Sequence, residues 1–351
     1  VTEKQLPWDE DMDAGGNYVS PGFIDIHVHG GGGRDFTDGG TEPILAAAEF
    51  HAGHGTTTIM PAMPAAEPGQ IENFLRDVRD AMARENGAAN IYGAHLEGPY
   101  LSKEQCGALN SDYMRSPEEA EYREITEAYQ GVLKRWTFAP ELPGSGRFYR
   151  YLRSQKIVGS VGHSNATYDD VKYVYDNGCR LVTHLYSAMS TVTRENGFRK
   201  PGVVESALLL EGMAVEIIAD FRHLPAELVR LVYKVKGADN ICLVTDAMRG
   251  AGMPEGPSVL GDIRNGIPCV IEDGVAKLPD RSAFAGSVAT ADRLVRGCVR
   301  EAGIDICDAV KMMSLSPARA MGIENKGDIR EGMDADILIF DSDINIKKVL
   351  V

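Results

Sequence analysis

Six residues carry imidazole or carboxylate groups at places where short apolar runs of the sequence end. The first two are His27 and His29, in the stretch PGFIDIHVHG. Side chains two residues apart in a strand point to the same face, so both rings can bind one ion. Further apolar runs end in or close to four more such groups, which are Glu97, His163, His184 and Asp246. Together the six predict a binding site for a divalent metal.

The size of this ligand set bears on the number of ions and on the chemistry. Four histidines and two carboxylates exceed what a single tetrahedral ion needs. The set therefore allows two ions about 3.5–4 Å apart, bridged by Glu97 and a hydroxide, as an alternative to one ion. Such a centre activates water and polarises a carbonyl oxygen, which suits hydrolysis of an amide. Asp246 is then the group that takes the proton from water and passes it to the leaving amine. Zinc is the first choice of metal, with iron and manganese as alternatives.

A repeated pattern of strands and helices must position these residues. From Phe23 onward, β-branched apolar runs alternate with amphipathic helical patterns, which is typical of parallel βα units. Eight units over roughly 230 residues favour an α/β fold of the (β/α)8 TIM barrel type, in which the carboxyl ends of the strands meet. We expect strands at residues 23–29, 56–63, 91–98, 133–141, 156–163, 180–186, 214–220 and 240–248. We expect helices between them at residues 42–55, 69–86, 116–129, 169–178 and 226–237.

The remaining segments predict a small β-sandwich domain formed from the N- and C-terminal segments. Residues 1–20 are acidic and lack an initiator methionine, and we interpret them as the remnant of a longer N-terminal part of that domain. The barrel is expected over residues 21–322, with a β-hairpin insertion around 262–280 that turns at Asn265-Gly266 and Asp273-Gly274. Helical patterns return at 287–303, 306–314 and 316–322, and residues 323–351 supply the C-terminal strands of the small domain.

Composition excludes several classes of partner. The formal net charge of -15 repels a phosphate backbone, so nucleic acid is not an expected partner. No apolar run approaches the roughly 20 residues that a membrane span needs, so we expect no membrane partner either. The six cysteines include no C-x-x-C pair, which is typical of reduced thiols in a cytoplasmic protein.

The chain resembles the N-acetylglucosamine-6-phosphate deacetylase family of the amidohydrolase superfamily from about Val19 to Asp341. The resemblance rests on PGFIDIHVHG, HLEGPYL, GHSNAT, THLYSAM, IIAD, VTDAM, AGS and SPARAMG. It implies a metal-dependent amide hydrolase of amino-sugar catabolism, which converts N-acetylglucosamine 6-phosphate to glucosamine 6-phosphate and acetate. It also implies a homodimer whose partner is a small amino-sugar phosphate.

The resemblance assigns roles to residues. Glu97, His163 and His184 match the ligands of the metal site that the family shares, while His27 and His29 match a pair that supports a second ion in some members. Asp246 matches the catalytic acid and base. A second catalytic residue, His223, matches a group that polarises the acetyl carbonyl or contacts the sugar phosphate. The residues that match the sugar pocket are Ala108, Leu109, Ser187, Ala188, Phe284, Ala285 and Gly286.

The resemblance is less complete at the phosphate and sugar positions. Arg199 matches the arginine that binds the phosphate, and Arg194 is its rival because the loop carries a small insertion. Leu109 replaces a usual histidine, Ser187 a usual asparagine and Phe221 a usual glycine. These departures leave the metal ligands intact but touch the sugar pocket. They keep open N-acetylgalactosamine 6-phosphate, or another N-acetylated compound, as the substrate. A barrel that binds metal without catalysis is the alternative outside the enzymes.

Other residues have simpler interpretations. His51 and His54 lie at a predicted helix end, where we expect solvated or capping roles. His95 shares a strand face with Glu97, so it either supports a ligand or packs in the core. Ser116 is the predicted cap of the helix that follows it.

Overall fold

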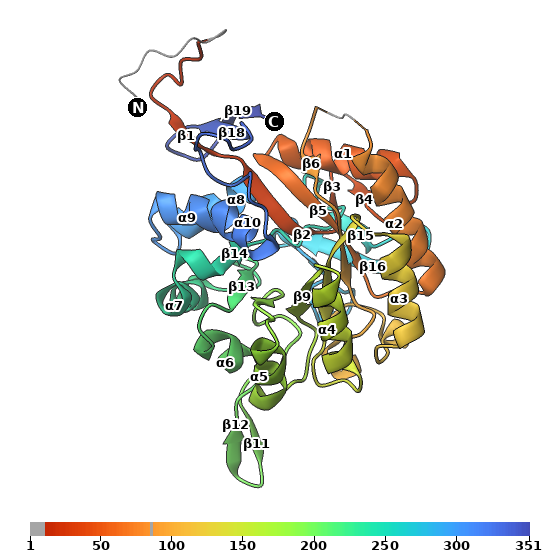
Figure 1. The fold of residues 1–351 in the computed structure, drawn as a ribbon. Helices are drawn as coiled ribbons and strands as arrows, with labels where there is room; N and C mark the ends of the chain where they lie inside the picture. Colours follow the sequence, from red (N-terminus) through yellow and green to blue (C-terminus); the bar gives the residue numbers. More distant parts are fainter. Residues whose placement is uncertain (1–10, 85–86) are drawn as a thin grey trace.

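A parallel barrel forms the centre of the structure, a computed structural model that describes residues 11–84 and 87–351 (Figure 1). Each strand of the barrel runs parallel to its neighbours in the order β14-β13-β10-β9-β8-β7-β5-β2. All eight expected strand positions are confirmed. The strands are β2 (Phe23–Val28), β5 (Thr56–Pro64), β7 (Ala94–Glu97), β8 (Leu133–Phe138), β9 (Val158–Val161), β10 (Leu181–Val182), β13 (Ala214–Ile217) and β14 (Ile241–Leu243).

The first and last strands of the barrel meet through individual contacts just beyond β14. The amide of Asp246 donates to the carbonyl oxygen of His27 at 2.9 Å, and the amide of His29 donates to the carbonyl oxygen of Ala247 at 2.8 Å. Below them, the Thr245 hydroxyl donates to the carboxylate of Asp25 at 2.5 Å. The barrel is therefore closed at the point where three of the predicted metal ligands lie.

Helices cover the outside of the barrel (Figure 1). None of the helices in the described part of the chain is long and apolar enough to cross a membrane. The helices α4 and α6 were not among the expected ones. The helices are α1 (Thr41–Ala52), α2 (Pro68–Met82), α3 (Glu119–Ala128), α4 (Ser145–Ser154), α5 (Tyr168–Asp176), α6 (Val203–Leu209), α7 (Ala226–Lys236), α8 (Ala291–Arg300), α9 (Ile306–Met313) and α10 (Leu315–Met321), with single 3-10 turns at η1 (Lys103–Gln105), η2 (Ser111–Tyr113) and η3 (Ala238–Asn240).

The predicted cap of α3 is wrong. The helix begins at Glu119 with Glu118 in extended conformation before it, so Ser116 lies outside the helix. The preceding residue, Arg115, explains this start. Its amide donates to the carbonyl oxygen of Pro99 and its guanidinium pairs with Glu121, so the chain stays attached to the barrel before it turns into the helix.

The two chain ends meet in one antiparallel sheet in the order β1-β18-β19 (Figure 1). Its strands are β1 (Tyr18–Pro21), β18 (Ile337–Phe340) and β19 (Ile346–Leu350). A sheet built from both ends agrees with the expectation. The described residues form a single sheet here and not the two of a sandwich, and residues 1–10 lie outside them. The borders of the predicted domains stay predictions.

Further small sheets lie in loops after barrel strands. The predicted insertion is a three-stranded sheet of β15 (Gly256–Leu260), β16 (Ile267–Glu272) and β17 (Val275–Lys277). The hairpin turn at Asp273-Gly274 has φ of 55° and 73°, as a type I′ turn requires. A separate hairpin of β11 (Thr193–Glu195) and β12 (Phe198–Lys200) projects away from the barrel (Figure 1). The remaining short strands are β3 (Gly30–Gly31), β4 (Arg34–Asp35) and β6 (Asn90–Ile91).

Candidate metal centre and active site

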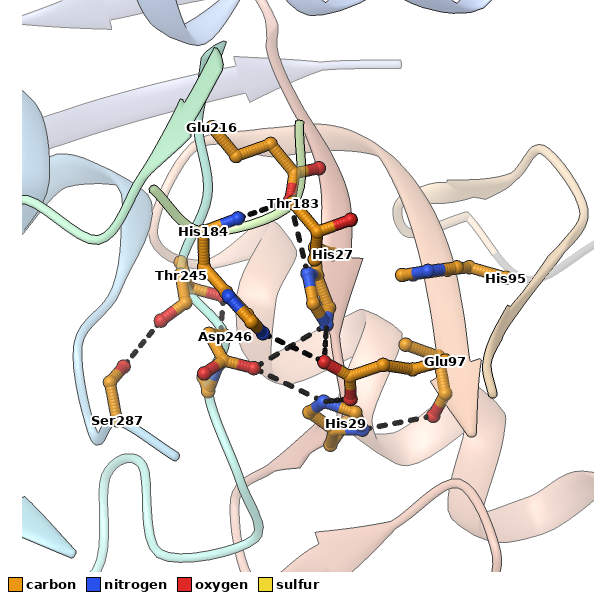
Figure 2. Close-up of polar contacts among 12 residues, drawn as sticks. His27, His29, His95, Glu97, Thr183, His184, Glu216, Thr245, Asp246 and Ser287 are labelled. Atoms are coloured by element: carbon orange, nitrogen blue, oxygen red, sulfur yellow. Dashed lines mark hydrogen bonds and ion pairs between the residues drawn. The ribbon is translucent and has the colours of Figure 1, made fainter. Parts of the chain in front are cut away.

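The six predicted ligands lie together at the carboxyl ends of the barrel strands. They form two groups of buried side chains, and in each group the potential ligand atoms lie within 4.8 Å of one another. Figure 2 shows five of the six labelled around one centre. One group is His27, His29 and Asp246, and the other is Glu97, His163 and His184.

The carboxylate of Glu97 lies between the two groups. Its Oε1 is 2.8 Å from Nε2 of His184 and 3.1 Å from Nε2 of His163. The same oxygen is 3.6 Å from Nε2 of His27, and Oε2 is 3.3 Å from Nε2 of His29. One carboxylate therefore reaches all four rings, which is the geometry that a bridging ligand needs.

Asp246 holds the opposite side of the first group. Its Oδ1 lies 3.1 Å from Nε2 of His29 and 3.5 Å from Nε2 of His27. The backbone at His163, His184 and Asp246 has φ of 47°, 22° and 47°, in the left-handed region that costs a non-glycine residue about 1–3 kcal/mol. Strain of this kind persists where the surroundings fix the backbone, and here it turns three side chains into the barrel mouth.

The rings are oriented by the nitrogen that faces away from the centre. Nδ1 lies 3.2 Å from Glu216 Oε2 in His27, 3.2 Å from the carbonyl oxygen of Ala62 in His29, and 2.8 Å from that of Gln105 in His163. Since Nδ1 is the donor in these contacts, Nε2 carries the lone pair whenever the ring is neutral. The buried Nε2 of His27 has no hydrogen-bond partner within the described part of the chain. This arrangement fits imidazoles that bind a metal through Nε2.

The charges of the site favour a cation. Burial opposes a charge on the rings, but the carboxylates of Glu97 and Glu216 outweigh it and raise the pKa of His27 to about 9. Burial also opposes ionisation of Glu97, yet the surrounding histidines hold the pKa of that carboxyl well below its usual range. The carboxylates are therefore ionised and need positive charge beside them, which protons or a metal ion supply.

A cavity of about 290 Å³ opens next to the ligands. Ala285 does not line it, because this residue is fully buried beneath the wall. His223 lines the cavity with its ring 4.8 Å from that of Phe284, and its Nδ1 donates to Asp220 at 2.8 Å. The other predicted sugar-pocket residues all line the cavity, and these are Ala108, Leu109, Ser187, Ala188, Phe284 and Gly286.

The structure does not bring either phosphate candidate to this cavity. Arg194 and Arg199 face each other across the β11–β12 hairpin, in which every residue is exposed. In the described residues of this chain, the cavity wall includes neither of these two residues nor any other arginine or lysine. Arg199 therefore does not line the cavity of its own chain, because the hairpin points outward, and its role at the phosphate stays a prediction.

Sequence reasoning missed two buried charges beneath the site. Glu216 contacts His27, and Arg135 pairs with Glu216. The signal was present, since each is a charged residue inside an apolar strand, in AVEIIAD and LKRWTF. Both lie inside their strands and not at the strand ends, where the predicted ligands lie.

The remaining histidines are also placed. Nε2 of His95 shares a hydrogen bond with the Thr137 hydroxyl, 2.7 Å away, and the centroid of its ring lies 4.6 Å from that of His27 in an edge-on contact. The ligand that His95 packs against is therefore His27, and not Glu97 as their shared strand face suggested. His51 is fully buried and its Nε2 donates to the carbonyl oxygen of Gly30 at 2.9 Å, so the solvated role expected for it is wrong. His54 pairs with Asp292 at 3.2 Å.

Comparison with known proteins agrees with this geometry. The chain matches the Amidohydrolase family over residues 18–351. The N-acetylglucosamine-6-phosphate deacetylase of Lysinibacillus sphaericus is 32% identical over 345 residues, covering 97% of this chain and 86% of the relative. The N-acetylgalactosamine-6-phosphate deacetylase of Escherichia coli O157:H7 is 30% identical over 335 residues, covering 95% and 86%. The crystal structure of the N-acetylglucosamine-6-phosphate deacetylase of Thermotoga maritima has a TM-score of 0.87 at 32% identity and covers 99% of this chain and 90% of its own. The chain belongs to the amidohydrolase family.

Proposed function

We propose that the protein hydrolyses the acetamide of N-acetylglucosamine 6-phosphate to give glucosamine 6-phosphate and acetate. The observation that carries this proposal is the carboxylate of Glu97 between two ligand groups at the edge of a sugar-sized cavity. The relatives from Lysinibacillus sphaericus and Thermotoga maritima bear the name of this activity.

The residues fit a divalent metal because four imidazoles, three of them oriented through Nδ1, converge with two ionised carboxylates. Glu97, His163 and His184 would hold one ion, and His27, His29 and Asp246 would hold a second. A bound ion would lower the pKa of water and polarise the acetyl carbonyl. Zinc is the metal we propose first, and iron and manganese suit the same ligands.

Asp246 transfers the proton between the attacking water and the leaving nitrogen. His29 and His27 overcome the effect of burial and hold the pKa of Asp246 below its usual value, so the carboxylate is ionised and ready to accept a proton. It takes this proton from the attacking water and delivers it to the leaving nitrogen. His223 donates Nδ1–H to Asp220, which leaves Nε2 for the substrate.

The phosphate requires a cation, and among the described residues no arginine or lysine lines the cavity. An arginine fork suits a phosphate best, and Arg199 and Arg194 are presented on a hairpin that projects from the molecule. We place this hairpin at the cavity of a second copy, which makes the enzyme a homodimer with Arg199 as the phosphate ligand. The free cysteines of the described residues favour a cytoplasmic location.

N-acetylgalactosamine 6-phosphate is the second candidate substrate. Leu109 and Ser187 line the cavity at positions that depart from the expected pattern. One relative is named as a deacetylase of the galacto isomer. Steady-state turnover on both hexosamine 6-phosphates and on their dephosphorylated forms tests the assignment. We expect the highest kcat/KM for the phosphorylated gluco isomer. A preference for the galacto isomer or a dephosphorylated sugar would overturn that choice and leave the hydrolase chemistry standing.

A further inference from the structure

Glu216 on β13 contacts one member of each ligand group. Its side chain is fully buried, and its Oε2 lies 3.2 Å from Nδ1 of His27 and accepts the amide N–H of His184 at 3.2 Å. Figure 2 shows the carboxylate beside both residues. His27 lies in β2 and His184 follows β10, so a single oxygen joins the two halves of the proposed metal centre.

Arg135 on β8 fixes this carboxylate in place. Its guanidinium pairs with Oε1 of Glu216 and donates to the carbonyl oxygen of Ile26 at 3.2 Å, directly before His27. It also donates to the hydroxyls of Ser160 at 3.0 Å and Thr183 at 2.9 Å. Every donor nitrogen of the fork therefore has a partner, and Glu216 cannot move without breaking a buried network.

We propose that Glu216, held by Arg135, is a positioning residue that orients His27 for the metal. By accepting Nδ1–H, it keeps His27 in the tautomer whose Nε2 lone pair faces Glu97 and Asp246. The inference rests on the proposed metal-dependent function. It assigns Glu216 no contact with the substrate.

Loss of the Glu216 carboxylate should weaken metal binding mainly at the group of His27, His29 and Asp246. At His27, the carboxylate contacts the ring that would bind the ion. At His184 it contacts only the main chain, whose neighbours Thr183 and Leu185 are separately bonded to Val161 and Glu216 backbone oxygens. Loss of the acceptor therefore releases the ring of His27 and leaves the backbone at His184 in place.

A purely structural role makes a different prediction. A buried ion pair contributes little to stability compared with well-packed apolar residues, so the pair is not needed merely to hold the fold. If Glu216 served only to neutralise Arg135, removal of both charges would leave metal binding unchanged. If it orients His27, an acceptor must stay at this position even without the charge.

Two double variants separate these roles. Arg135→Met with Glu216→Met has no buried charge and no acceptor, whereas Arg135→Met with Glu216→Gln keeps an amide oxygen. We expect zinc at the His27 group to bind about 10–100-fold more weakly in the Met/Met protein and with wild-type affinity in the Met/Gln protein. Zinc titration and elemental analysis, both without substrate, give the result. Asp336→Asn, which breaks a buried pair with Lys326 near the terminal sheet, is the matched control and should keep wild-type zinc content.

Equal zinc binding by the two double variants, whether unchanged or equally weakened, would overturn the proposal. Should either variant not fold, ring ¹⁵N NMR of His27 in the zinc-loaded wild-type protein decides the matter. We expect a protonated Nδ1 and a metal-bound Nε2, and the opposite assignment or an unbound ring would overturn the proposal. Neither measurement uses a sugar, so the outcome is independent of the proposed deacetylase activity.

Discussion

Glu97 Oε2 lies 3.3 Å from Nε2 of His29, although the two residues belong to different ligand groups. The other oxygen of Glu97 reaches His163 and His184. Because one carboxylate serves both groups, loss of Glu97 should weaken metal binding in both groups. Loss of a single ring should weaken it only in the group to which that ring belongs. This asymmetry can be measured.

Substitution of Glu97 by Gln should lower metal content in both groups, because the amide removes the negative charge that all four rings face. Substitution of His27 by Gln should remove only one equivalent, taking the content from two ions to one. Elemental analysis of purified protein gives both values, with His54→Gln as a control outside the centre. Unchanged metal in His27→Gln would exclude His27 as a ligand.

Substitution of Asp246 by Asn should lower kcat by about 10²–10⁴-fold, because the amide cannot accept the proton of the attacking water. Metal content measured on the same samples separates loss of the base from loss of an ion. Asp262→Asn, on an exposed loop of the insertion, is the control and should keep wild-type kcat. Full kcat in Asp246→Asn would show that this carboxylate is not the base. Bound metal without any activity in the wild type would instead favour a barrel that binds metal without catalysis.

Much of the fold and most of the centre could be predicted because both depend on local patterns. Each barrel strand lies in a short apolar run, and each of the six predicted ligands lies at or near the end of one of these runs, where a barrel gathers side chains. His27 and Asp246 could be paired in this way although they are distant in sequence. The hydrogen bond between their backbones shows that the strand ends do meet.

What could not be predicted depends on tertiary packing. Glu216 lies inside a strand, so a search of strand ends passes over it, and only the barrel brings its carboxylate to His27. The sequence also gives no direction for the hairpin that carries Arg199. The burial of His51 could not be predicted for the same reason, because it arises from contact with the Gly30 turn and not from the position of His51 at a helix end.

The buried ring of His51 should make the stability of the folded protein depend on pH. Burial is the main cause that lowers its pKa from 6.5 to about 4. As the pH falls below 6.5 the unfolded chain takes up this proton and the folded chain does not, so stability present above pH 6.5 is lost as the pH falls towards 4. The shift corresponds to about 3 kcal/mol.

Denaturant unfolding of the wild type and His51→Gln at pH 7 and pH 4 measures this effect. The free energy of unfolding should fall between the two pH values by about 3 kcal/mol less in His51→Gln than in the wild type. Ile44→Val, a buried change in the same helix without a titrating group, should keep the wild-type difference. An equal fall in wild type and His51→Gln would contradict the assignment.

The proposed role of Arg199 predicts that efficient turnover of the phosphorylated sugar requires two copies of the chain. Arg199→Met should raise KM for the phosphorylated sugar and leave the dephosphorylated sugar unaffected, because only the phosphate loses a partner. Mixing this variant with Glu97→Gln, after dissociation and reassociation, should restore activity, since a mixed dimer contains one intact centre facing one intact hairpin. Arg281→Met, an exposed arginine that pairs with Glu272, controls for the loss of surface charge and should keep wild-type KM. If the mixture is no more active than its components, the hairpin does not act on a second copy.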